Sequence, residues 1–163
     1  MNNMWRITKY NPANRDGRGV YLINEWTSYS DIGKHYNGVE FTIAEYEQYE
    51  KAYIDSILCL MECNSIETLK IVELEKYEDE NADERINSIT EGMMLSKKQI
   101  KIVAQHVLRE KLWCKLVLDQ IFYVHFGYDY NMYIGSCKKC EKVIKEIECK
   151  NMYIEPFKSP YLD

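Results

Sequence analysis

The sequence has few of the features that mark membrane, fibrous or secreted proteins. Its longest run of apolar residues, Ile57 to Met61, is five residues long, far short of the roughly 20 that a membrane span needs. The opening residues, MNNMWRITKY, contain no apolar segment of the kind that secretory signals carry. Seven Gly and three Pro exclude collagen-like or linker-dominated architecture. We therefore expect a soluble, cytoplasmic protein without a membrane segment.

The length and the composition fit one globular domain. The chain has 163 residues, close to the prior of about 150 residues per domain. Hydrophobic residues make up 46% and charged residues 29% of the chain, which excludes wholesale disorder. No internal repeat or low-complexity tract divides it. We predict a single domain over residues 1–163.

The charge of the chain is concentrated in one segment. The net charge is −5, and residues 73–85 hold seven acids and two bases, which accounts for all of it. The basic clusters are small: Arg15 with Arg18, and the stretch at 138–145. A duplex-binding domain usually has a broad basic face, so nucleic-acid binding is disfavoured. The acidic segment is typical of a solvated loop, and it could also steer a basic partner.

The cysteines show half of a metal-binding pattern. Without a secretory signal, the six Cys are expected to be free cytosolic thiols. Cys137 and Cys140 form C-x2-C, but no second such pair exists. Cys149 and His125 would complete a Cys3His zinc set as the alternative. The favoured interpretation has no metal, no cofactor and no disulfide.

Tyrosine is unusually frequent, with fourteen Tyr against four Phe. A buried Tyr needs a hydrogen-bond partner for its hydroxyl, so several rings are expected to be half-exposed. Tyr is enriched at protein interfaces, and it is also common on the faces of sheets. The surplus therefore favours an interface and a structural role about equally.

Strand patterns are spread along the chain. Alternation between Trp113 and Phe126 predicts one long strand, or two strands broken near Asp119 and Gln120. The segment 127–129 suits a turn that returns through 130–134. The further expected strands are 4–10, a short extended piece at 20–23, 68–75 and 151–155.

A first helix is predicted to open at Thr42. Thr42 and Glu45 have the T-x-x-E spacing of a capping box. Helical periodicity then places one carboxylate, Glu50, inside the apolar stripe, so Glu50 is expected to be buried beside a Tyr, Arg or His. The apolar stripe comprises Ile43, Tyr46, Tyr49, Tyr53, Ile54, Ile57, Leu60 and Met61.

A second helix is predicted near Lys97–Leu112 after the capping residue Ser96. His106 lies opposite the apolar stripe of this helix and is expected on the surface. A short helix is expected within residues 138–148, and residues 86–95 fit a short strand or irregular structure. The order of elements favours an α+β fold, an antiparallel-rich sheet with two main helices packed on one face.

The densest polar and aromatic cluster runs from Tyr123 to Tyr133. Within it, His125 and Asp129 flank a tight turn, and a carboxylate beside an imidazole is the usual device for fixing its tautomer. Glu50 would be the third member if the first helix crosses the sheet there. No nucleophile motif such as G-x-S-x-G accompanies these residues. A structural histidine is the more common outcome for such a pattern.

Several segments resemble a family of small bacterial proteins whose activity is uncharacterised. The similar segments span nearly the whole chain and are WRITKYNP, EWTSYSDIG, EYEQYEKAYI, LREKLWCKL, HFGYDYNMYIG and the closing SPY. The resemblance implies a single domain and a bacterial cytosolic origin. It brings no activity, fold or catalytic residue with it.

Two functions from different classes remain. The favoured one is a protein-binding module, such as an immunity protein or inhibitor that neutralises a basic bacterial toxin. The alternative is a small enzyme or small-molecule-binding protein that uses a pocket of Glu50, His125 and Asp129. An enzyme is the less favoured of the two. The residues expected to contact a partner are Glu78, Asp79, Glu80, Asp83, Glu84, Tyr128 and Tyr130.

Overall fold

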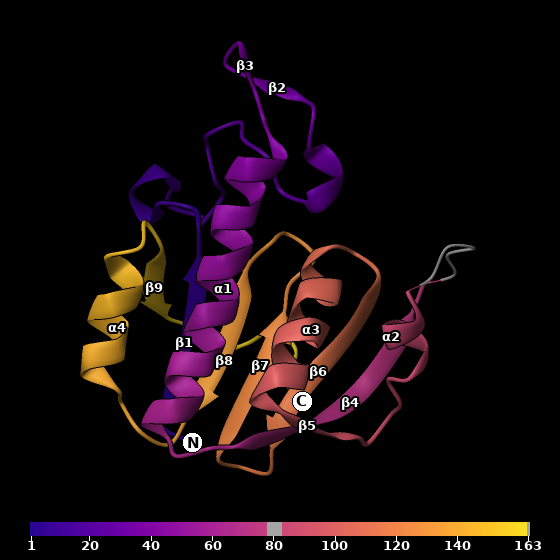
Figure 1. Cartoon of the computed structure of the whole chain (residues 1–163). Coiled ribbons are helices and arrows are strands. Elements are labelled where there is room, and N and C mark those ends of the chain that lie inside the picture. Colours follow the sequence, from indigo (N-terminus) through magenta and orange to yellow (C-terminus); the bar gives the residue numbers. More distant parts are fainter. Residues whose placement is uncertain (78–82, 163) are drawn as a thin grey trace.

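A seven-stranded antiparallel sheet with helices is the framework of the molecule (Figure 1). The computed structural model describes residues 1–77 and 83–162. The strands of the sheet follow the order β5-β4-β6-β7-β8-β1-β9. Their bounds are β1 (Asn3–Thr8), β4 (Thr68–Lys76), β5 (Met94–Ser96), β6 (Leu112–Leu118), β7 (Phe122–Phe126), β8 (Met132–Ser136) and β9 (Tyr153–Pro156).

Two long helices, α1 (Ile43–Cys63) and α3 (Lys97–Leu108), lie side by side across one face of this sheet (Figure 1). This arrangement confirms the predicted α+β fold with two main helices on one face. The shorter helices are α2 (Glu84–Asn87) and α4 (Glu141–Glu148). A small hairpin of β2 (His35–Tyr36) and β3 (Val39–Glu40) projects beyond the N-terminal end of α1.

The first helix begins where the capping pattern predicts. The Thr42 side chain accepts a hydrogen bond from the Glu45 backbone N–H at 3.3 Å, which satisfies one free donor of the first turn. Most of the predicted stripe is buried, but Ile43 is 43% exposed and Tyr49 is half-buried. The buried face of α1 therefore begins at Tyr46, one turn later than the periodicity suggests.

The second helix is shorter than predicted, because the chain reverses at its end. α3 ends at Leu108, and Glu110 has a φ of 59°. The Lys111 N–H donates back to the His106 carbonyl at 2.9 Å, and Leu112 already belongs to β6. The expected surface position of His106 is also wrong. His106 is only 7% exposed, and it lines one cavity together with Asp83, Arg85 and Ile86.

The alternating segment after α3 forms two strands, as one of the two expectations had it. β6 and β7 are separated at the predicted break, where Asp119 has a φ of 41°. The extended piece expected at 20–23 forms no strand. An isolated bridge between Arg15 and Tyr21 is its only described pairing.

One pair of cysteines overturns the expectation of free thiols throughout. Cys63 at the end of α1 and Cys140 before α4 form a disulfide. The partners are 77 residues apart in the chain, so their proximity depends on the tertiary fold. Cys59, Cys114, Cys137 and Cys149 are free. The alternative Cys3His zinc set is also excluded, because Cys140 has no thiolate to offer a metal.

Candidate functional site

Glu50 lies between the two main helices. The residue is 4% exposed, and its carboxylate bonds to Gln105 of α3 and to the capping residue Arg109. Arg109 Nε donates to Oε2 at 2.7 Å, and Arg109 Nη2 donates to Oε1 at 3.0 Å. Gln105 Nε2 adds a third hydrogen bond to Oε1 at 3.0 Å. The expectation of a buried, partnered Glu50 is confirmed, and its contacts join α1 to α3.

His125 lies on the other face of the sheet. Side chains alternate along β7, so Val124 faces the helices and His125 faces away from them. His125 Nδ1 is 2.8 Å from Ser159 Oγ in the C-terminal segment, and its ring stacks on Tyr123 at 4.3 Å. Burial, and then the nearby Lys115 ammonium, lower the pKa of His125 to about 4. The imidazole is therefore neutral at pH 7.

Asp129 caps its own turn. Its carboxylate accepts hydrogen bonds from the Asn131 backbone at 3.3 Å and from Asn131 Nδ2 at 2.6 Å. Among the described residues, no hydrogen bond or ion pair joins Asp129 to His125, or either of them to Glu50. The structure does not bring the three candidate catalytic side chains together. Ser159, which does contact His125, carried no sequence signal beyond the closing SPY.

The acidic partner-binding residues are only partly described. Glu78, Asp79 and Glu80 lie outside the described residues. Asp83 caps α2 by accepting the Arg85 N–H at 2.9 Å, and hydrogen bonds from Arg85 lower the pKa of Asp83 to about 2. Glu84 is exposed on the first turn of α2. Asp83 therefore has a cationic partner within the chain, whereas Glu84 faces solvent.

The two tyrosines expected at the partner surface differ in exposure. Tyr128 is 69% exposed and stacks on Trp113 with 6.0 Å between ring centroids. Tyr130 is only 5% exposed and packs edge-on against Trp26, Tyr46 and Tyr53. The expectation for Tyr130 is wrong, because its ring fills the aromatic core and offers no surface to a partner.

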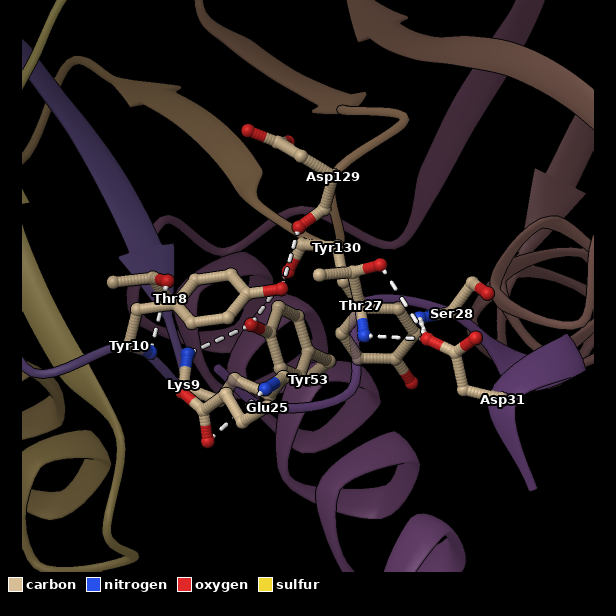
Figure 2. A network of polar contacts seen from close by, with 10 residues as sticks. All are labelled: Thr8, Lys9, Tyr10, Glu25, Thr27, Ser28, Asp31, Tyr53, Asp129 and Tyr130. Carbon is tan, nitrogen blue, oxygen red and sulfur yellow. Dashed lines mark hydrogen bonds and ion pairs between the residues drawn. The ribbon is translucent and has the colours of Figure 1, made fainter. Parts of the chain in front are cut away.

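A buried lysine that we did not expect lies where β1 ends (Figure 2). The Lys9 side chain is 1% exposed, and its Nζ lies 4.1 Å from the ring centroids of both Tyr10 and Trp26. Glu25 Oε2 is its ion-pair partner at 3.5 Å. Burial lowers the pKa of Lys9 to about 8, although Glu25 and Glu45 oppose this shift. Alternation could have revealed it, because Lys9 shares a strand face with Trp5 and Ile7.

Tyrosine hydroxyls connect this lysine segment to the rest of the core. Tyr53 Oη accepts a hydrogen bond from the Lys9 backbone N–H at 2.8 Å and donates to the Tyr130 carbonyl at 2.7 Å. Tyr10 Oη donates to the Asp129 carbonyl at 2.9 Å (Figure 2). These bonds fix the end of β1 to α1 and to the turn between β7 and β8. They also explain part of the tyrosine surplus, because these hydroxyls satisfy buried backbone groups.

A second polar cluster fixes the loop that follows Trp26. Asp31 Oδ2 accepts hydrogen bonds from the Thr27 N–H at 2.8 Å and the Ser28 N–H at 3.3 Å (Figure 2). Lys34 Nζ donates to Asp31 Oδ1 at 2.7 Å. The loop is therefore held in one conformation beside the β2–β3 hairpin.

The projecting end, which we define as residues 20–45, has a hollow in its surface and several exposed apolar side chains. A hollow of about 200 Å³ lies between the loop at 23–26 and the β2–β3 hairpin, with Ile23 and Val39 among its lining residues. Large apolar side chains are exposed along this end. They are Val20 (51%), Leu22 (64%), Ile23 (46%), Val39 (67%) and Ile43 (43%).

In residues 1–77 and 83–162, no group of three or more His, Cys, Asp or Glu side chains is placed to hold a metal ion. No helix within these same ranges is long and apolar enough to cross a membrane.

In comparisons with known proteins, no family model, no curated protein and no solved structure matches this chain. The resemblance to a bacterial family stays a prediction. The function is therefore inferred from the geometry of the chain itself.

Proposed function

We propose that this protein is a binding module for another protein, of the inhibitor or immunity-protein type. The observation that carries the proposal is the projecting end, where five large apolar side chains are exposed within residues 20–43. Two of the five, Ile23 and Val39, line the same hollow, and exposed apolar side chains that lie together are typical of an interaction site. The Leu22 N–H donates to the Asn14 carbonyl at 2.9 Å, and β2 pairs with β3, so the segments that carry these side chains are held by backbone hydrogen bonds and little ordering is needed on binding.

The expected partner is a basic protein. The chain has a net charge of −5, and acidic side chains accelerate association with a basic surface. Glu25, Glu40 and Glu45 line the hollow on the projecting end. The same end therefore combines apolar contact area with negative charge, as binding to a basic toxin requires.

Site-specific photo-crosslinking in the source cells tests this function. A photoreactive residue at Leu22 or Val39 should capture one protein, whereas the same residue at exposed Lys142 on α4 should capture none. The captured protein, once purified, should bind the wild-type chain at least tenfold more tightly than the variant carrying Leu22→Ser and Val39→Ser. Equal capture at Lys142, or equal affinity for the double variant, would contradict the proposal.

The acidic segment has its own test. Neutralising Glu78, Asp79, Glu80, Asp83 and Glu84 together should slow association with the captured partner at low salt. The difference should shrink at high salt, because screening shortens the reach of exposed charges to about 8 Å at physiological ionic strength. If wild type and the neutralised variant associate at equal rates at both salt concentrations, the acidic segment takes no part in recognition. Unfolding of the variant in urea serves as the control for its structure.

A cytoplasmic location is part of the proposal, and the disulfide bears on it. The Cys63–Cys140 disulfide weighs against this location, because disulfides are rare in reducing compartments. Cell fractionation tests the location. The protein should be recovered in the cytoplasmic fraction, and recovery outside the cytoplasm would contradict the location.

A further inference from the structure

The hollow on the projecting end carries an excess of negative charge. Three carboxylates, Glu25, Glu40 and Glu45, belong to its lining, and no Lys or Arg does. Lys9 lies behind the lining and pairs with Glu25 at 3.5 Å. Glu40 and Glu45 are exposed, and neither forms an ion pair with any residue in the described ranges. The hollow thus keeps two carboxylates without a cationic partner.

The walls of the hollow are preformed. Trp26 stacks on Phe41 with 4.5 Å between ring centroids, and Lys9 Nζ lies 4.1 Å from the Trp26 ring. The hairpin beside it closes with Asn37 at φ 51° and Gly38 at φ 79°, the left-handed pair that a tight two-residue turn requires. A ligand therefore meets a fixed apolar wall with carboxylates at its rim, and little conformational entropy is lost on binding.

We propose that this hollow receives a lysine or arginine side chain of the partner protein, an inference that rests on the proposed function. The methylene stem of such a side chain would pack against Val39 and Ile23, and its cationic head would lie at Glu40 and Glu45. Long basic side chains bind in this way, with an apolar stem and a charged tip. A bare metal ion does not fit, because the described carboxylates form no metal-holding group.

Lys9 provides a reporter for this site. Glu25 and Glu45 both raise the pKa of Lys9 against the effect of burial. A second cation at the hollow would offset these carboxylates, so the Lys9 ammonium would lose its proton more readily. The pKa of Lys9 should therefore fall when the hollow is occupied, whereas binding elsewhere on the surface would leave it unchanged.

The experiment uses small probes and the intact chain. Nα-acetyl-lysine amide and Nα-acetyl-arginine amide, whose side chains keep their charge, are titrated into isotope-labelled protein. Nα-acetyl-norleucine amide serves as an uncharged analogue of similar length. Saturable shifts of the Trp26 indole and Val39 amide signals are expected from at least one basic probe, at concentrations tenfold or more below any effect of norleucine. The Lys9 side-chain titration should move to lower pH in the saturated sample.

Charge-removing variants complete the test. Glu40→Gln with Glu45→Gln should weaken the basic probe at least tenfold, whereas the matched pair Glu146→Gln and Glu148→Gln on α4 should leave it unchanged. Equal shifts from norleucine, shifts confined to other surfaces, or full affinity in the Glu40/Glu45 variant would each overturn the inference.

These outcomes are separable from failure of the proposed function. If a partner is captured at Leu22 and Val39 but neither basic probe binds the hollow, the binding function is supported and the insertion of a basic side chain is contradicted. If no partner is captured, the function fails even where the hollow binds a probe.

Discussion

Glu50 and Arg109 form a bidentate ion pair that joins α1 to the end of α3, with Nε–Oε2 at 2.7 Å and Nη2–Oε1 at 3.0 Å. The Glu50 side chain is 6% exposed and that of Arg109 is 26% exposed. A fork of two parallel hydrogen bonds is among the stronger polar contacts in proteins. The pair therefore fixes how the two main helices lie against each other.

Removing this carboxylate should destabilise the fold. Glu50→Ala is expected to lower the free energy of unfolding by about 1–3 kcal/mol, because it leaves Arg109 and Gln105 without their acceptor. Urea unfolding at pH 7 measures the change. Glu47→Ala is the matched control, since Glu47 is exposed and lies 3.6 Å from the same guanidinium. Its effect should stay within about 0.5 kcal/mol. Equal effects of the two substitutions would contradict the structural role of Glu50.

Reducing the disulfide should also destabilise the protein. Cys63 and Cys140 are 77 residues apart in the chain. The disulfide between them restricts the unfolded chain, so its loss should lower the free energy of unfolding by about 2–4 kcal/mol. Urea unfolding of Cys63→Ser with Cys140→Ser, against wild type, measures it. Cys59→Ser, on the same helix, should have little effect on this scale. A thiol assay under denaturing, non-reducing conditions should count four of the six cysteines, and a count of six would contradict the pairing.

Acid should weaken the fold through His125. Its folded-state pKa of about 4 lies below the unfolded value of about 6.5, so the unfolded chain binds more protons between these limits. The stability that is present above pH 6.5 is therefore lost as the pH falls, by about 2 kcal/mol between pH 7 and pH 5. Urea unfolding across this range checks the slope.

The control for this slope is a second histidine. His125→Asn, which retains a nitrogen for Ser159, should remove most of the slope. Burial also lowers the pKa of His106, so His106→Asn should remove a smaller part. An unchanged slope in His125→Asn would refute the assignment.

Alkali should strengthen the fold through Lys9. The folded-state pKa of about 8 lies below the unfolded value of about 10.4, so the unfolded chain binds more protons between them. The Lys9 contribution to stability should therefore rise by about 2 kcal/mol from pH 7 to pH 9.5. Burial raises the pKa of Cys114 and of several tyrosines, so these groups lower the stability over the same range. The Lys9 contribution is therefore measured as the difference between wild type and Lys9→Met, by unfolding in urea at several pH values. A difference that does not change with pH would contradict the assignment to Lys9.

Patterns with a short period could be predicted from the sequence. Alternation between Trp113 and Phe126 located β6 and β7, and the break near Asp119 coincides with a residue of positive φ. The capping residues Thr42 and Ser96 located the starts of α1 and α3. These features depend on residues within a few positions of each other, which a single sequence displays directly.

The features that were missed depend on distant parts of the chain. The pairing of Cys63 with Cys140 and the contact of His125 with Ser159 require the folded sheet and helices. His106 lines a cavity together with residues of α2, a helix of four residues that is too short to show periodicity. The predicted helix extends past the real end of α3 at Leu108. The chain reverses at Glu110, which adopts a positive φ, and only a glycine at that position would have indicated the end of the helix in the sequence.

The position of β1 in the sheet affects the order in which the protein can fold. Within this sheet β1 comes earliest in the chain, yet its neighbours are β8 and β9, which come latest. Contacts between such distant segments form slowly, because a long stretch of chain must first be ordered. On the ribosome, the hairpins of β4–β7 can pair while β1 still has no neighbour. β1 therefore gains its first neighbour only when β8 has emerged, and a chain that stops before β9 would leave β1 as an exposed edge strand.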